Sequence, residues 1–175
     1  MNNGQDGWAI RQATHVEATA VAAMVRDSFQ DVAARFELTP QNCPSHPSNC
    51  VPEWIERSMG KGVIFYVVES DGRLCGSVGM TPSANGACKM ISLAVLSDRR
   101  RSGLGRALVG RVLEQAASLG LARVEIAIIA KHAELRRWYE KLGFIWDRTE
   151  TFEALPFEVG FMRLDLHTVQ KVRTL

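Results

Sequence analysis

The sequence predicts an α+β domain in three α/β/α layers, with a mixed, mostly antiparallel sheet of about seven strands, one central parallel pair and about four helices. Three observations lead to this fold class. Segments with the period of a strand alternate with segments with the period of a helix along most of the chain. The dipeptide Asp71-Gly72 separates two apolar runs and indicates a tight antiparallel hairpin. A strand, helix, strand order in the second half predicts one right-handed crossover and hence a parallel pair.

The length and composition of the chain exclude several classes of protein. With 175 residues, a single domain over 1–175, with its core at about 8–166, can bury most of its apolar surface without disulfides or metal. The formal net charge of +2 argues against wholesale nucleic-acid binding. No apolar run reaches the roughly 20 residues of a membrane helix, and the first residues lack an export signal. We therefore expect a cytoplasmic protein, not bound to a membrane, whose four cysteines are free.

The first third of the chain predicts a strand, a helix, a loop and a short helix. Residues 8–14 alternate apolar and polar, and residues 14–29 then place apolar side chains at helical spacing. Four prolines within residues 37–52 predict an irregular loop. The segment 52–59 begins with Pro52, which is typical of the first turn of a helix.

The middle of the chain predicts a three-stranded antiparallel meander. Its strands are expected at residues 62–70, 73–80 and 88–95, and the second turn falls at residues 82–87. A helix follows up to Gly120, which is a typical stop signal. We expect its apolar stripe to consist of Leu104, Leu108, Val112 and Leu119.

The last third predicts the crossover and two more strands. Residues 122–130 form a strand rich in isoleucine, and residues 133–144 form a helix with apolar residues three and four apart. The segments 145–154 and 157–166 then supply two strands on either side of Pro156. These C-terminal strands offer edges through which two subunits could pair as a homodimer.

The segment Ser97–Gly110, "SDRRRSGLGRALVG", has the features of a phosphate-binding loop. A loop that enters a helix presents unbonded backbone N–H groups at the positive end of the helix dipole. Gly103 and Gly105 let that backbone approach an anion closely, and arginine at 100, 101 and 106 adds permanent positive charge. Arg106 after Gly105 excludes the nucleotide-triphosphate loop, and Leu108 in place of a third glycine excludes the dinucleotide fingerprint.

The pattern Arg100-x-x-Gly103-x-Gly105, between a strand and an amphipathic helix, resembles the acetyl-CoA loop of the GNAT N-acetyltransferase superfamily. The segment "WYEKLGF" at Trp138–Phe144 is similar to a second signature of that superfamily. The resemblance covers residues 8–166 and implies one acetyltransferase domain that uses acetyl-CoA as cosubstrate. The cofactor-binding residues that it implies are Leu93, Ala94, Val95, Arg100, Arg101, Ser102, Gly103, Leu104, Gly105, Arg106 and His132.

The same resemblance implies direct transfer of an acetyl group to a primary amine of a small molecule or peptide. Tyr139 is then the catalytic general acid, because a tyrosine with a pKa of about 10 can protonate a thiolate whose conjugate acid has a pKa of about 8.5. Packing beside Trp138 is the alternative reading of Tyr139. The amine must lose a proton before it attacks, and the candidates for the base are Glu69, Glu125, Glu153, His46 or a chain of water molecules.

The loop "NCPSHPSNC" admits three interpretations. Cys43, His46 and Cys50 could hold zinc, but the sequence offers no fourth ligand and no two-cysteine knuckle, so we expect no metal. By the resemblance, the loop borders the acceptor site, and His46 and Glu153 are then substrate contacts. The third interpretation is a loop that merely connects two helices.

A different class of function stays open at this point. A non-catalytic module on the same fold could bind CoA as a ligand, or could bind RNA through the arginine cluster at 99–101.

Overall fold

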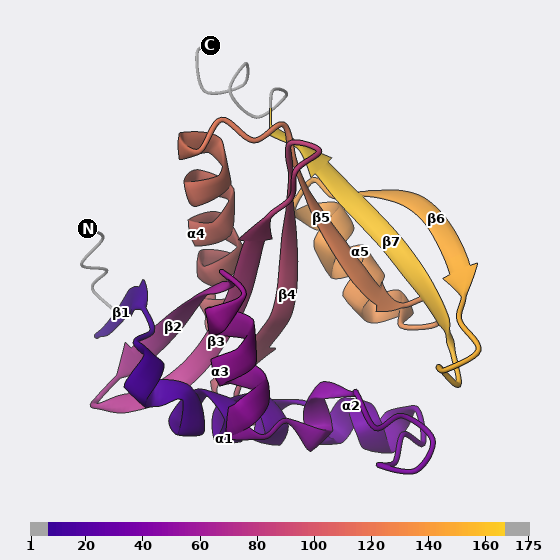
Figure 1. The fold of residues 1–175 in the computed structure, drawn as a ribbon, viewed down its shortest axis with the longest axis horizontal. Coiled ribbons are helices and arrows are strands. Elements are labelled where there is room, and N and C mark those ends of the chain that lie inside the picture. Colours follow the sequence, from indigo (N-terminus) through magenta and orange to yellow (C-terminus); the bar gives the residue numbers. More distant parts are fainter. Residues whose placement is uncertain (1–6, 167–175) are drawn as a thin grey trace. The chain divides into compact units, whose positions relative to one another are not determined.

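The computed structural model describes residues 7–166 of the chain (Figure 1). Within this range the strands are β1 (Trp8–Gln12), β2 (Ile64–Ser70), β3 (Arg73–Pro82), β4 (Ala87–Val95), β5 (Arg123–Ile129), β6 (Ile145–Thr151) and β7 (Glu158–Asp165). The α-helices are α1 (Ala18–Ser28), α2 (Gln30–Arg35), α3 (Pro52–Gly60), α4 (Leu104–Ser118) and α5 (Ala133–Lys141). Short 3-10 turns are η1 (His15–Glu17), η2 (Pro47–Asn49) and η3 (Ser97–Arg99). No helix within this range has the length and apolar character needed to cross a membrane.

The strands form one sheet in the order β1-β2-β3-β4-β5-β7-β6. Strand β4 pairs with β5 in parallel, while β1 with β2, β2 with β3, β5 with β7 and β6 with β7 are antiparallel. The mixed sheet of about seven strands with one parallel pair is thereby confirmed. The parallel pair follows from the crossover through α4, since a parallel connection needs a helix or a similar long crossover.

The described residues divide into two compact units, one of residues 7–80 and 92–111 and the other of residues 81–91 and 112–166. The boundary runs through β3, β4 and α4 rather than between elements. The single domain expected over 1–175 stays a prediction.

The first unit has a core in which α1 and α3 cover β2. Its buried members include Val21 and Val25 of α1, Ile55 of α3, and Phe65 and Val67 of β2. These positions confirm the helical spacing expected for residues 14–29.

Helix α4 approaches the sheet closely at Gly76 of β3. A Cβ atom at this position would lie 2.9 Å from the carbonyl oxygen of Ala94 and 3.2 Å from Cδ1 of Leu108. Gly76 therefore lets the side chain of Leu108 pack directly on the strand.

The second unit combines β5, β7 and β6 with α5 (Figure 1). The buried residues Ile126 and Met162 face each other across β5 and β7. Gly160 of β7 lies under the ring of Trp146, because a Cβ atom there would come within 2.1 Å of Cη2 of this ring. Tyr139 of α5 is buried and forms an edge contact with Phe144, with ring centroids 5.3 Å apart.

Several local expectations are confirmed, one is wrong, and one helix was not predicted. Asp71 and Gly72 both have positive φ, as a tight hairpin requires, and Gly120 ends α4 with φ +69°. Leu119 lies past the end of α4 and is 48% exposed, so it does not belong to the apolar stripe. The helix expected over 14–29 is confirmed by α1, but a second helix, α2, that the sequence analysis did not predict follows it after one residue, Phe29.

Candidate active site

The loop between β4 and α4 has the backbone geometry of an anion cradle. Arg101 has φ +62° and Gly103 has φ +87°, a left-handed backbone that is typical of anion-binding loops, and α4 begins directly after them at Leu104. Within residues 7–166, the backbone N–H groups of Arg101 to Arg106 find no acceptor. Because these donors lie at the positive end of a 15-residue helix, the segment can bind an anionic group.

The two glycines of this loop differ in their conformation. Gly103 needs its positive φ, which a side chain with a Cβ atom disfavours, whereas Gly105 lies in the first turn of α4. Ser102 donates its hydroxyl to the carbonyl oxygen of Arg99 at 2.5 Å, which closes the turn. The side chains of Arg101 and Arg106 are exposed.

Arg100 points back into the protein. Its Nη2 donates to the carbonyl oxygen of Ser28 at 2.6 Å and to Oδ1 of Asp31 at 3.1 Å. Its Nη1 donates to Oδ2 of Asp31, and its Nε donates to the carbonyl oxygen of Val95 at 3.2 Å. The Arg100 guanidinium lowers the pKa of the Asp31 carboxyl through these hydrogen bonds.

Strand β4 supplies the expected backbone segment Leu93, Ala94 and Val95. Its pairing with β5 covers Ala87–Lys89 and Arg123–Glu125. Farther along β4, Ser92 has φ +49°, an unusual value for a residue with a side chain, so the strand is irregular just before this segment.

Tyr139 is placed by α5 in an aromatic cluster. Its ring makes edge contacts with Trp138, at 4.8 Å between centroids, and with Phe144. Burial raises the pKa of Tyr139 well above its usual value, because the charged form would lose its hydration. The hydroxyl is protonated at neutral pH, as a general acid requires, but the raised pKa makes it a weaker proton donor than an ordinary tyrosine.

The two histidines of the predicted site have structural partners. His132 is the N-cap of α5, and its Nδ1 accepts a hydrogen bond from the backbone N–H of Leu135 at 3.4 Å. His46 is 6% exposed, and its Nδ1 forms a hydrogen bond of 2.8 Å with the hydroxyl oxygen of Ser48. Burial lowers the pKa of His46, so the ring is neutral at pH 7. The predicted contacts of both residues with ligands stay predictions.

The candidate bases fall into two groups. Glu69 pairs with Arg11 at 2.8 Å and Glu125 pairs with Arg123 at 2.6 Å. Glu153 is exposed in the turn between β6 and β7. An arginine thus already occupies the carboxylates of Glu69 and Glu125, whereas Glu153 forms no ion pair with another described residue.

The cysteine loop shows free, buried thiols at Cys43 and Cys50. Among the described residues, no group of three or more His, Cys, Asp or Glu side chains is arranged to hold a metal ion. The carbonyl oxygen of Cys43 accepts a hydrogen bond from the side chain of Asn49 at 3.1 Å, so the loop is tied together by its own polar groups.

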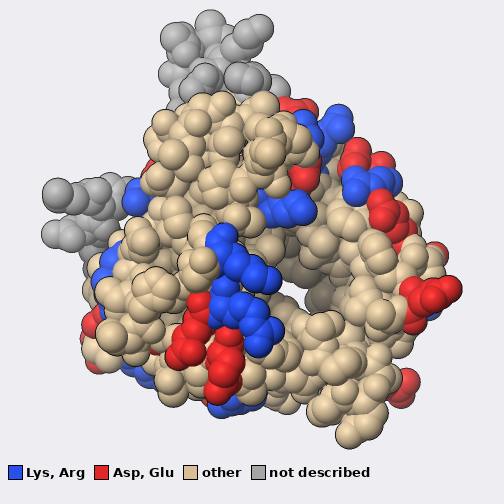
Figure 2. Space-filling model, viewed as in Figure 1, with Lys and Arg blue, Asp and Glu red and all other residues tan. Residues whose placement is uncertain are grey.

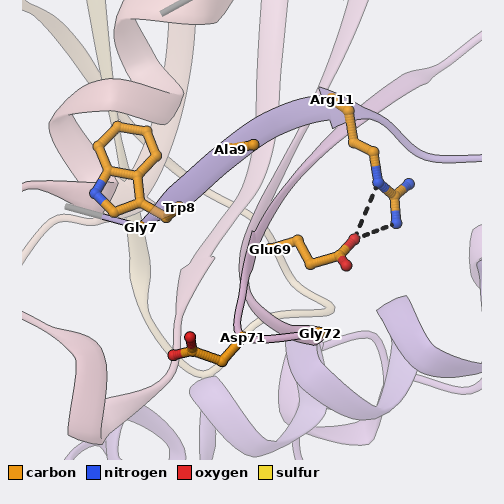
Figure 3. Close-up of a pocket in the computed structure, with 7 residues that line it drawn as sticks. All are labelled: Gly7, Trp8, Ala9, Arg11, Glu69, Asp71 and Gly72. Carbon is orange, nitrogen blue, oxygen red and sulfur yellow. Dashed lines mark hydrogen bonds and ion pairs between the residues drawn. The ribbon is translucent and has the colours of Figure 1, made fainter. Parts of the chain in front are cut away.

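A hollow of about 460 Å³ lies elsewhere in the first unit, beside β1 (Figure 3). Trp8 lies on one side of it, the pair Arg11 and Glu69 on the other, and Asp71 at the turn between β2 and β3. None of the residues expected to bind acetyl-CoA lines this hollow. It is open to solvent, and Arg11 is already paired with Glu17 and Glu69.

Charged side chains elsewhere are mixed in sign. Figure 2 shows Lys and Arg side chains beside Asp and Glu side chains on the face that it presents. Near the loop, Asp98 pairs with Arg73 at 3.4 Å and Asp31 pairs with Arg100. This mixture differs from the continuous basic surface that binds nucleic acid.

Comparison with known proteins decides the family. The model described as the acetyltransferase (GNAT) family matches residues 25–144. The chain belongs to the GNAT acetyltransferase family. This membership confirms the resemblance seen in the loop and in the tyrosine helix, and it supports an acyltransferase activity.

One curated relative and several solved structures resemble this GNAT protein. A probable N-acetyltransferase, camello, from Xenopus tropicalis is 27% identical over 121 residues, which are 64% of this chain and 55% of that protein. The chain thus spans just over half the length of this relative.

The solved structures agree in fold over most of both chains. A putative GNAT acetyltransferase from Desulfovibrio desulfuricans has a TM-score of 0.71 at 22% identity, covering 91% of this chain and 99% of that one. The ribosomal-protein-S18-alanine N-acetyltransferase of Escherichia coli has a TM-score of 0.69 at 17% identity, covering 91% and 94%. A putative acetyltransferase from Salmonella typhimurium, solved with acetyl-CoA, has a TM-score of 0.67 at 20% identity, covering 92% and 95%.

Sequence reasoning missed Ser28 and Asp31 as partners of the loop. No local pattern marks them, because they lie 72 and 69 residues from Arg100. The helix break after Ser28 brings them to Arg100, and neither Gly nor Pro marks this break in the sequence.

Proposed function

We propose that this GNAT protein is an N-acetyltransferase that passes the acetyl group of acetyl-CoA directly to a primary amine of a small molecule or peptide. The observation that carries the proposal is the row of N–H groups from Arg101 to Arg106, which find no acceptor within residues 7–166. A pyrophosphate presents several oxygens along a short length, and such a row of donors suits it. Acetyl-CoA supplies an activated thioester for the transfer.

The proposal assigns separate tasks to the residues of the chain. The loop 101–106 holds the pyrophosphate, and backbone groups of Leu93, Ala94 and Val95 hold the arm of the cofactor and polarise the thioester carbonyl. The neutral amine nitrogen forms a bond to the acetyl carbon and loses one proton to solvent, and the carbon–sulfur bond breaks. Tyr139 then donates its hydroxyl proton to the departing sulfur, and the tyrosine regains a proton from solvent.

The amine must be neutral when it attacks, although an alkyl ammonium has a pKa of about 10.4. Glu153 or a chain of water molecules is the proposed route for its proton. The ion pairs of Glu69 and Glu125 and the contact of His46 with Ser48 make these three less suitable.

Two measurements on the full chain test the proposal. Acetyl-CoA near 1 mM should raise the melting temperature, because a ligand that binds the native state alone stabilises it. Thiol release should then appear with at least one member of a panel of amines. The panel includes peptide amines, because one structural neighbour is named a ribosomal-protein-S18-alanine N-acetyltransferase.

Three outcomes are distinguishable. Binding with turnover supports the enzyme, while binding without turnover for any amine supports the non-catalytic CoA module. Absence of a melting shift contradicts both, and RNA binding that weakens steeply with salt would then favour the arginine cluster as an RNA site. A cytoplasmic location and pairing of two subunits are further proposals; the free thiols of the four cysteines are what a reducing compartment maintains.

A further inference from the structure

The chain breaks its first long helix at Phe29, and this break leaves a carbonyl group to be satisfied. Phe29, with φ −102° and ψ 3°, ends α1 and begins α2. In an unbroken helix, the N–H of Val32 would donate to the carbonyl oxygen of Ser28. Instead, this N–H donates to Oδ1 of Asp31 at 2.9 Å. The carbonyl oxygen of Ser28 is thus available to a partner from outside the helix.

That partner is Arg100 of the loop before α4. Its guanidinium donates to Ser28, to both carboxylate oxygens of Asp31 and to the carbonyl oxygen of Val95. These bonds use four of the five N–H donors that a guanidinium has. The carboxylate of Asp31 also balances its charge, so a phosphate could use Arg100 fully only if these bonds broke first.

The geometry points to Arg100 and Asp31 as a pair of positioning residues that fasten the cofactor loop to the junction of α1 and α2. This inference rests on the proposed use of acetyl-CoA. Arg100 binds the carbonyl of Val95 at the start of the loop and the helix junction at the same time, so it fixes where residues 101–106 leave the sheet. The donors of the cradle are therefore held in place before the pyrophosphate arrives.

The variant Asp31→Asn distinguishes a positioning role of Arg100 from direct contact of Arg100 with phosphate. Asparagine keeps the oxygen that accepts from Val32, but it turns an amide N–H₂ group toward the guanidinium in place of the second oxygen. If Arg100 positions the loop, Asp31→Asn loosens it and weakens acetyl-CoA binding. If Arg100 contacts phosphate, Asp31→Asn frees the guanidinium and leaves binding unchanged or makes it tighter.

The test measures the affinity of wild-type and variant full-length protein for acetyl-CoA by calorimetry. We expect Asp31→Asn and Arg100→Ala each to raise Kd roughly tenfold, the scale of one lost charge-assisted hydrogen bond. The Kd of the double variant for acetyl-CoA should be no higher than that of Arg100→Ala, because the two residues act as one unit. The melting temperature without ligand should change little, since the side chains of the pair are 37% and 54% exposed.

A second readout separates a role in the loop from a general structural role. S-acetylpantetheine lacks the pyrophosphate, so its kcat/KM should change less than twofold in Asp31→Asn, whereas kcat/KM for acetyl-CoA should fall about tenfold. Equal losses with the two substrates would overturn the inference.

Asp98→Asn is the matched control. The carboxylate of Asp98 lies in η3, beside the same loop, and pairs with Arg73 instead of Arg100. The Kd of Asp98→Asn for acetyl-CoA should stay within about twofold of the wild type. The inference fails if Asp31→Asn binds acetyl-CoA as well as or better than wild type while the wild type binds normally. A wild type that does not bind acetyl-CoA refutes the proposed function, and the inference falls with it.

Discussion

Gly160→Ala should destabilise the protein because β7 and Trp146 leave no room for a methyl group. A Cβ atom at 160 would lie 2.1 Å from Cη2 of Trp146 and 2.8 Å from Cζ2 and Cζ3. A shift of the indole would disturb its contact with Arg136, whose guanidinium carbon lies 4.2 Å from the ring centroid. Overpacking of this kind costs about 1–3 kcal/mol, and a disturbed cation–π contact adds about 0.5–1 kcal/mol. We expect a total of about 2–3 kcal/mol.

The assay is thermal and urea unfolding of Gly160→Ala beside a matched variant, Gly110→Ala. Gly110 lies inside α4, and nothing lies within 4 Å of the Cβ position there, so alanine should stabilise the helix by about 1 kcal/mol. For a chain of this size, the loss at 160 corresponds to a Tm lower by about 5–10 °C. The reasoning is refuted if Gly160→Ala is as stable as the wild type, or if both variants shift Tm in the same direction.

Three further predictions concern the loop, the tyrosine and an ion pair. Gly103→Val should weaken acetyl-CoA binding about tenfold, because φ +87° costs a residue with a side chain about 1–2 kcal/mol. Arg99→Ala should change the Kd for acetyl-CoA less than about threefold. If calorimetry gives the reverse order, the loop binds through the charge of its arginines and not through its backbone. Tyr139→Phe should lower kcat about a hundredfold with little change in Kd, and unchanged turnover, with chemistry shown to limit the rate, would remove Tyr139 from the mechanism. Arg11 lowers the pKa of Glu17 from 4.5 to about 2, so the contribution of this ion pair to stability is present above pH 4.5 and is lost as the pH falls toward 2. Glu17→Gln should therefore flatten the dependence of Tm on pH between 4.5 and 2. A curve as steep as that of the wild type would contradict the assignment.

The sequence predicted those elements whose causes are local. Asp71 and Gly72 form the expected turn because a tight hairpin requires positive φ at both residues. Gly120 ends α4 for a similar reason. Leu119 was wrongly assigned to the buried stripe because helical spacing continues in the sequence after the helix itself has stopped. The break at Phe29 was missed because neither Gly nor Pro marks it.

The cradle of N–H groups was determined by the sequence itself, because the conformation of Gly103 and the start of a helix depend on neighbouring residues. The partners of Arg100 were decided by the tertiary structure alone. The sequence alone does not distinguish the contacts of Arg99, Arg100 and Arg101, because the three are adjacent and carry the same charge. Packing of a broken helix against the loop brings Ser28 and Asp31 to Arg100 across about 70 residues, and this long-range contact gives that arginine a role that no local pattern could assign.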